Sequence, residues 1–109
     1  MTEAGLSELE LLVLGAVAGL GDAPYGLIVR REIAEQTGRQ IAIGSVYRSL
    51  AGLERKGLVA SKKGDPTPVR GGRAKRFFQL TGAGEQALRR TVSDLRSLAK
   101  DFDIGVTPA

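Results

Sequence analysis

The stretch GSVYRSLAGLERKGLV, residues 44–59, has two different sides when it is drawn as a helix. Three apolar residues recur at steps of four and three and form one stripe that can face a core, namely Val46, Leu50 and Leu53. The first turn carries hydrogen-bonding groups instead, which are Ser45, Tyr47 and Arg48. The pattern predicts a helix over about 43–56 that is held by its inner stripe, presents a polar tip and stops at Gly57.

The composition is that of a small globular protein. With 109 residues, 42% apolar and 26% charged, the chain is long enough for one domain with a modest core. It contains no cysteine and no histidine, which excludes disulfides, thiolate metal sites, histidine-dependent triads and the usual zinc sites. We therefore expect neither an enzyme nor a bound cofactor or metal.

The first residues do not resemble a targeting segment. The stretch MTEAGLSELE has no basic region, and the longest apolar run, LLVLGAVAGL, is well below the about 20 residues that span a bilayer. We expect a cytoplasmic protein with no membrane association.

Positive charge is concentrated in the middle of the chain. Residues 48–76 hold nine basic and two acidic residues, a net +7, whereas the whole chain has a net charge of +4, which leaves −3 for the remainder. Such asymmetry indicates binding to a polyanion, although a basic loop can also be a solvated face.

The first helix is predicted to begin at Ser7, because Ser7 and Glu10 have the spacing of a capping box. One broad apolar face follows, formed by Leu9, Leu12, Val13, Ala16, Val17 and Leu20. A second stripe on the opposite side consists of Leu11, Leu14 and Ala18. A helix of this kind is buried on two sides. We expect a second subunit to cover the second stripe, which makes Leu11, Leu14 and Ala18 candidate dimer contacts, and the alternative is a central helix wrapped by its own chain.

A second helix is predicted from Tyr25 or Gly26 to Thr37, after the break LGDAPYG, with Gly38 as its left-handed cap. We expect its inner face to be Leu27, Ile28, Ile33 and Ala34. The following RQIAI is predicted to be a short extended piece, which forms a short strand in the expected order of elements.

Two segments with alternating polarity, LVASKK (58–63) and AKRFFQL (74–80), predict the strands of a hairpin. On the second strand, Phe78 and Leu80 should share one face, opposite Lys75, Phe77 and Gln79. Between the strands, GDPTPVRGG has two prolines and three glycines, which predicts a long basic loop.

Thr81 is a predicted cap for a last helix that runs to about Phe102. Apolar residues recur along it at steps of four and three, as in a coiled-coil seam: Leu88, Val92, Leu95, Ala99 and Phe102. The same spacing also fits a helix that docks on its own domain. We interpret residues 82–103 as a dimerisation helix, residues 1–81 as the main domain and residues 104–109 as a flexible tail.

This order of elements predicts a mainly α fold with a small β-hairpin, a winged helix-turn-helix plus a C-terminal dimerisation helix. In that arrangement the third helix is the recognition helix, and its N-terminal residues read base edges in the major groove. The candidate residues on it are Gly44, Ser45, Tyr47, Arg48 and Ser49, and Arg48 is the best candidate for a base contact. The candidates for phosphate contacts are Tyr25, Lys62, Lys63, Arg70, Arg73, Lys75 and Arg76.

Four stretches resemble, in order and spacing, the winged-helix domain of PadR-type transcriptional regulators: LSELELLVLGAV, PYGLIVRREI, GSVYRSLAGLERKGLV and RGGRAKRFFQLTGAGEQAL. The resemblance covers residues 6–90. It implies repressors that bind operator DNA as two-fold dimers, which assemble through the C-terminal helix with help from the first. For some members it also implies release of DNA when a small aromatic or drug-like effector enters at the dimer interface, and no residue here identifies such a ligand.

The sequence departs from the family in two respects. Ala42 stands where relatives often have a capping serine, so the start of the recognition helix is expected to be displaced or less firmly fixed. A single C-terminal helix is expected, as in short members, without a larger effector domain. A rival hypothesis from the residues alone is a winged-helix module that binds an acidic protein partner.

Overall fold

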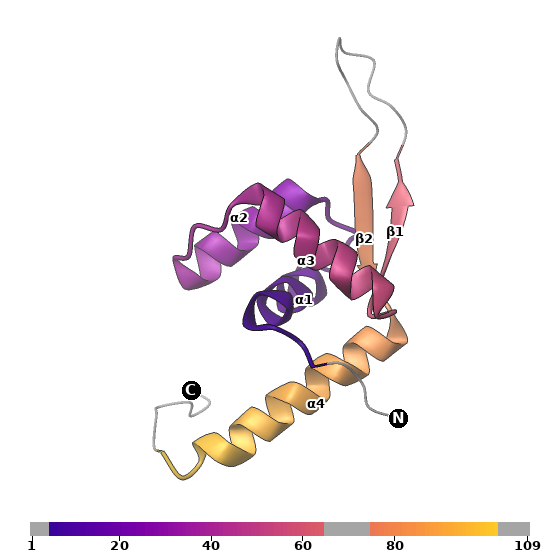
Figure 1. Cartoon of the computed structure of the whole chain (residues 1–109). Helices are drawn as coiled ribbons and strands as arrows, with labels where there is room; N and C mark the ends of the chain where they lie inside the picture. Colours follow the sequence, from indigo (N-terminus) through magenta and orange to yellow (C-terminus); the bar gives the residue numbers. More distant parts are fainter. Residues whose placement is uncertain (1–4, 65–74, 103–109) are drawn as a thin grey trace.

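The computed structural model describes residues 5–64 and 75–102 of the chain. In order along the sequence, these form α1 (Glu8–Leu20), α2 (Gly26–Thr37), α3 (Ile43–Arg55), β1 (Val59–Lys63), β2 (Arg76–Leu80) and α4 (Gly82–Ala99). The predicted class, mainly helical with one small antiparallel hairpin, is confirmed (Figure 1).

Helix α1 is the centre of the core. Its capping box is present as predicted, because the Ser7 hydroxyl accepts from the Glu10 amide and the Ser7 amide donates to the Glu10 carboxylate, both at 3.0 Å. Its broad face lies against α2 and α3. The interpretation of the opposite stripe is wrong for Leu14, which is fully buried within the single chain. Because α1 packs against α2, α3, β2 and α4, only Leu11 and Ala18 of that stripe keep exposed surface.

Helix α2 is buried along Gly26, Val29 and Ile33 and ends, as predicted, at Gly38 with φ of 76°. The predicted inner face was wrong for Leu27, whose side chain is 52% exposed. The buried stripe at steps of three and four places Leu27 about one residue out of phase with the core, since each helical residue turns by roughly 100°.

The extended piece before α3 does not become a strand in the described part of the chain. Phe78 of β2 donates its amide to the Pro24 carbonyl at 2.9 Å, and Tyr25 forms an isolated bridge with Phe77. The free edge of β2 is therefore occupied by the turn before α2. The expected strand therefore cannot pair with β2 at this edge.

The residues of the hairpin alternate between its two faces as predicted. Strand β1 pairs antiparallel with β2, with Val59 opposite Leu80 and Lys63 opposite Arg76. Val59 and Phe78 are buried on the face toward the helices, whereas Gln79 is exposed on the other face. The alternation read from the sequence is thus confirmed.

Helix α4 begins where predicted, because the Thr81 hydroxyl accepts from the Gly84 amide at 3.0 Å. Its first turn lies directly on the chain reversal after α3. The Thr81 hydroxyl donates to the Gly57 carbonyl at 2.7 Å, and a Cβ at Gly84 would overlap the Leu58 carbonyl oxygen. The helix ends at Ala99, before the expected Phe102, and then passes into a turn.

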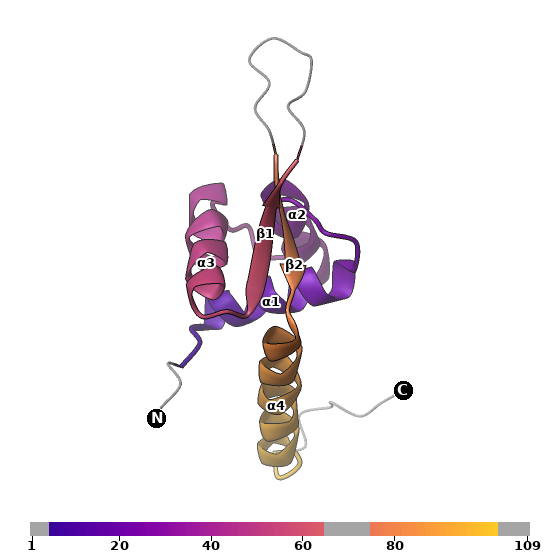
Figure 2. The same cartoon turned by 90° about the vertical axis from the view of Figure 1, so that its right-hand side faces the viewer.

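Different elements lie at the two ends of the molecule. The start of α3 and the end of the hairpin at Lys63 and Arg76 point in the same direction, and α4 extends the opposite way (Figures 1 and 2). A surface built from α3 and the hairpin is therefore separate from α4.

Candidate nucleic-acid interface

The first turn of α3 presents a small polar group on a rigid base. Val46, Leu50 and Leu53 have no exposed surface, which fixes the helix on α1 and α2 as predicted. On the outer side, the Arg48 guanidinium donates to the Ser45 hydroxyl at 3.0 Å. Arg48 is exposed, so the donors it does not use toward Ser45 face solvent.

The start of this helix is where the pattern predicted it, at Ile43. Ala42 has the extended backbone of an N-cap residue, with φ of −62° and ψ of 139°, and supplies no side-chain cap. The expected displacement of the helix start is absent in the described chain. Helix α3 therefore starts at the predicted residue without a side-chain cap.

Ser49 does not project outwards. It was predicted at the exposed tip, but its exposure is 8% and it lies between the buried stripe and α1. Four residues separate it from Ser45, which rotates it by roughly 40° toward the core. Ser49 is thus removed from the residues that can reach a ligand directly.

Tyr47 packs on α2. A Cβ at Gly26 would overlap the Tyr47 ring, so glycine at this position lets the ring lie over the start of α2. The side chain remains 44% exposed. The ring of Tyr47 thus packs against the second helix, and the exposed part of Tyr47 lies beside the first turn of α2.

The Tyr25 ring contacts two side chains, Phe77 of β2 and Lys75, which immediately precedes β2. The Tyr25 and Phe77 rings meet edge to face, with centroids 6.0 Å apart and an interplanar angle of 89°. The Lys75 ammonium lies 4.3 Å from the centroid of the Tyr25 ring. This cation–π contact places a positive charge next to the start of α2.

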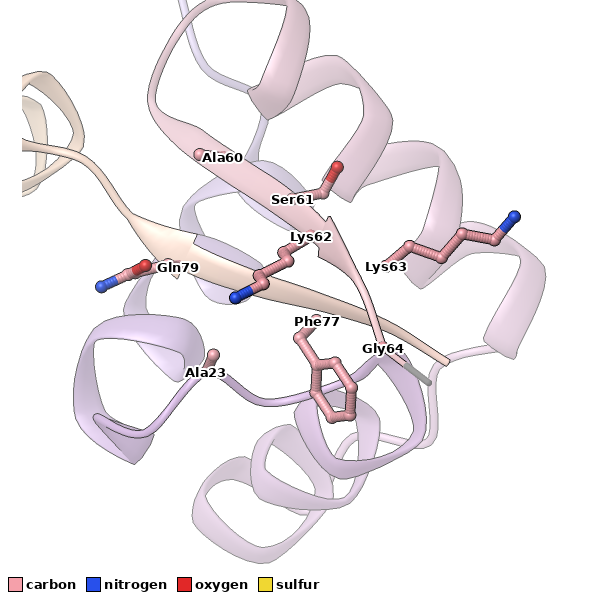
Figure 3. Close-up of a pocket in the computed structure, with 8 residues that line it drawn as sticks. All are labelled: Ala23, Ala60, Ser61, Lys62, Lys63, Gly64, Phe77 and Gln79. Atoms are coloured by element: carbon pink, nitrogen blue, oxygen red, sulfur yellow. The ribbon is translucent and has the colours of Figure 1, made fainter. Parts of the chain in front are cut away.

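The described cations of the hairpin divide between its two faces. Lys63 and Arg76 are opposite each other on the face that also carries Phe78, whereas Lys62 is opposite Phe77 on the other face. Figure 3 shows Lys62 and Lys63 pointing away from each other. Lys62, Phe77 and Ala23 line a hollow of about 420 Å³ on the outer side. Sequence reasoning treated these cations as one group, whereas the structure divides those that it describes between two faces of the hairpin.

Arg76 is connected to α3 by a chain of hydrogen bonds. Its guanidinium donates to the Ser61 hydroxyl at 2.9 Å, and that hydroxyl donates to the Glu54 carboxylate at 2.6 Å. The nearby carboxylate offsets part of the charge on Arg76. Lys63 therefore carries more of the free positive charge on this face.

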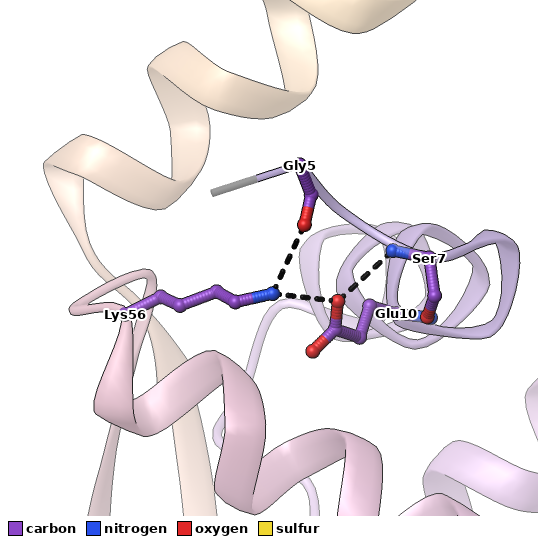
Figure 4. Close-up of polar contacts among 4 residues, drawn as sticks. All are labelled: Gly5, Ser7, Glu10 and Lys56. Atoms are coloured by element: carbon purple, nitrogen blue, oxygen red, sulfur yellow. Dashed lines mark hydrogen bonds and ion pairs between the residues drawn. The ribbon is translucent and has the colours of Figure 1, made fainter. Parts of the chain in front are cut away.

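The far end of α3 is fixed by a polar cluster (Figure 4). The Lys56 ammonium donates to Glu10 at 2.8 Å and to the Gly5 carbonyl at 3.2 Å. Burial raises the pKa of the Glu10 carboxyl, but the hydrogen bonds and charge from Lys56 and the bonds with Ser7 together lower it. The Glu10 carboxylate thus stabilises both the start of α1 and the end of α3.

Sequence reasoning missed two arginines near the start of α3. The Arg30 Nε donates to the Ile41 carbonyl at 2.7 Å, and Arg39 forms an ion pair with Glu8 at 3.3 Å. Neither partner is at a helical or strand spacing from its arginine, so no local sequence signal indicates these contacts. The predicted contacts Arg70 and Arg73 lie outside the described residues.

A second surface, apolar in character, runs along α4. Gly84 is the one residue of this helix classed as buried, and Leu88 packs partly on the core. Beyond it the predicted seam is open in the single chain, with Val92 38%, Leu95 58% and Phe102 71% exposed, and Ala99 partly covered. Leu98, which the seam did not include, is 65% exposed and widens the same apolar surface.

The model of the PadR-like family of transcriptional regulators matches residues 16–90, which include α2, α3, both strands and the first half of α4. The chain belongs to this family. The match covers both the anchored helix and the hairpin beside it, so the two features described above are those of a PadR-like regulator.

Solved structures agree with this PadR-like fold. A PadR family transcription regulator from Clostridium difficile is similar with a TM-score of 0.75 and 19% identity, over 93% of this chain and all of the other. A PadR-like transcription factor from Bacteroides fragilis gives a TM-score of 0.71 and 17% identity, covering 87% of this chain and 86% of that one. RosR from H. salinarum gives 0.67 and 28% identity, over 99% and 84% of the two chains. A search of the curated proteins gives no match.

None of the helices within residues 5–64 and 75–102 combines sufficient length with sufficient apolar character to cross a membrane.

Proposed function

We propose that this PadR-like chain is a cytoplasmic homodimeric repressor that binds a near-palindromic site in double-stranded DNA and catalyses no reaction. The observation that carries the proposal is the first turn of α3, where exposed Arg48 and half-buried Ser45 lie next to a stripe with no exposed surface. An anchored helix with such a tip has the properties of a recognition helix in the major groove.

The side chains divide by what they can recognise. Arg48 can donate two parallel hydrogen bonds to guanine, and Ser45 orients its guanidinium for that contact. Gly44 allows close approach, since the nearest atom to a Cβ there would be an Arg48 nitrogen at 3.5 Å. Base contacts are thus assigned to this turn.

Phosphate contacts are assigned to the hairpin and to the start of α2. Lys63 projects from the strand face that is turned toward α3, and Lys75 stands over Tyr25 beside α2. Tyr25 and Tyr47 bring hydroxyl groups to the same region. Such contacts set affinity and orientation without reading sequence. Lys62, Arg76, Arg70 and Arg73 remain predicted members of this set.

Dimerisation is assigned to residues 82–103, with Leu11 and Ala18 of α1 adding to the surface. The exposed leucines of α4 support a seam with a second copy, because apolar residues at this density on one helix are ordinarily covered. Two recognition helices in a two-fold dimer would reach half-sites roughly 34 Å, or about 10 base pairs, apart.

The proposal is tested by selecting binding sites from a random pool of double-stranded DNA with the purified chain. We expect a near-palindromic consensus, and binding that weakens steeply as salt rises from 50 to about 200 mM. Sedimentation of the complex should give two chains for each duplex.

A failure to enrich any sequence, with a flat response to salt, would contradict DNA recognition. It would instead favour the alternative of a protein-interaction module, in which the cations of the hairpin bind an acidic partner. Transcription of a reporter from the selected site then decides repression, which requires lower output when the chain is present.

A further inference from the structure

Arg30 is the one described arginine whose side chain is fixed by the segment that leads into α3. Its Nε donates to the carbonyl oxygen of Ile41, two residues before the helix begins, at 2.7 Å. The side chain is partly buried. This contact places the guanidinium at the N-terminal end of the recognition helix, which is the end proposed to face DNA.

The hydrogen bond uses only one edge of the guanidinium. Within the part of the chain that the structure describes, the two terminal nitrogens of Arg30 have no hydrogen bond or ion pair. The residues one turn away along α2 are Gly26, Leu27, Ile33 and Ala34, none of which is acidic. The positive charge of Arg30 is therefore not offset on its own helix.

The neighbouring arginine of the turn differs in this respect. Arg39 is paired with Glu8 at 3.3 Å, so a ligand would have to compete with that carboxylate. Arg30 has no such competitor in the described chain, and its orientation is already set. A guanidinium fixed at Nε presents its terminal nitrogens as a planar fork, a shape that fits two oxygens of one phosphate.

We propose that Arg30 binds a backbone phosphate of duplex DNA at the border of the groove that α3 enters, and that its bond to Ile41 orients it for this contact. This inference rests on the proposed function and adds a contact that the sequence did not single out. The preset orientation lowers the entropy lost on binding, which a free surface lysine would pay in full.

The test compares Arg30→Met, Arg30→Lys and the control Arg31→Met by measuring affinity for a random 30-base-pair duplex and for the selected site over a range of salt. Arg31 is the next residue, carries the same charge and is exposed. We expect Arg30→Met to weaken both duplexes about tenfold for each bound chain, the scale of one charged hydrogen bond. The slope of log affinity against log salt should fall by about 0.9 per chain, or about 1.8 per dimer.

Arg30→Lys should keep the salt slope and recover only part of the affinity, because lysine cannot form the oriented fork. Arg31→Met should leave both quantities nearly unchanged. Thermal unfolding of each variant separates a loss of folding from a loss of binding. If Arg30→Met lowers the melting temperature but leaves the salt slope unchanged, Arg30 only supports the turn and the phosphate assignment is wrong. If the unmodified chain binds no duplex, both this inference and the proposed function are wrong.

Discussion

Helices α3 and α4 are both amphipathic, yet they end up in opposite states. The apolar stripe of α3 is fully covered, with Val46, Leu50 and Leu53 at 0% exposure, whereas Leu95 and Leu98 of α4 remain 58% and 65% exposed. The chain itself completes the packing of α3. It leaves α4 with an apolar face that a second copy is proposed to cover. An amphipathic pattern therefore predicts that one face of a helix is buried, but not which chain covers it.

The largest effect on stability is expected when a residue of the buried apolar stripe of α3 is truncated. Leu53→Ala removes a side chain with no exposed surface and should lower the free energy of unfolding by about 2–5 kcal/mol. The measurement is denaturant unfolding at several protein concentrations. Leu27→Ala is the control, because Leu27 is 52% exposed and should cost less than about 1 kcal/mol. Equal losses in the two variants would contradict the described core.

The next largest effect is expected on dimerisation, when the exposed apolar face of α4 is changed. Leu95→Glu places a charge on the proposed seam, and the dimer dissociation constant should rise at least tenfold, or about 1.4 kcal/mol. Sedimentation equilibrium measures it, and Leu27→Glu serves as the matched control on an exposed leucine away from α4. If both variants stay as dimeric as the parent chain, α4 is not the seam.

A smaller and more selective effect is expected at the tip of α3. Arg48→Ala should cost about 1–3 kcal/mol at the selected site and relax the preference for one base pair. Lys62→Ala should weaken selected and scrambled DNA alike, since a phosphate contact reads no sequence. Competition binding with single-base variants of the site measures both the loss of affinity and the change in base preference. A uniform loss in Arg48→Ala would show that Arg48 contacts phosphate only.

The smallest effect concerns the cluster at the far end of α3. Because the pKa of Glu10 is lowered below its ordinary value of 4.5 in the folded chain, its carboxylate stabilises the fold fully above that pH. This contribution is lost as the pH falls through the folded pKa. The difference in unfolding free energy between the parent chain and Glu10→Gln should stay under about 1 kcal/mol and shrink below pH 4.5.

Denaturant unfolding from about pH 3 to about pH 7 measures this difference in unfolding free energy. The range spans the titration of an ordinary carboxyl group, at roughly pH 4. In a Lys56→Met background the same substitution should have a smaller effect, because the strongest partner of Glu10 is gone. An unchanged pH dependence in that background would remove Lys56 as the cause.

Local patterns predicted the elements because each depends on neighbours in the sequence. The capping box of Ser7 and Glu10, the cap at Thr81 and the stop at Gly38 involve residues at most four positions apart, and all are present. The alternation of the strands and the stripe of α3 are confirmed for the same reason. The end of α4 was placed too late, since no local signal distinguishes the last helical turn from the turn that follows it.

The errors arose where distant segments compete for the same surface. Leu14 was assigned to an outer stripe because a helical projection does not show how far α2 and α3 wrap around α1. Ser49 was assigned to the tip although its position on α3 turns it toward α1. The expected strand before α3 failed because residues 24–25 already occupy the edge of β2.

The sequence by itself determined the helices, the hairpin, the anchored stripe and the polar tip, because periodicity, caps and glycine stops act over a few residues. Only the tertiary structure decided which cations share a surface, that Tyr47 lies on Gly26, and that Arg30 is directed by Ile41. These contacts join residues from different elements. Their geometry depends on how the whole chain packs, which no short stretch of sequence specifies.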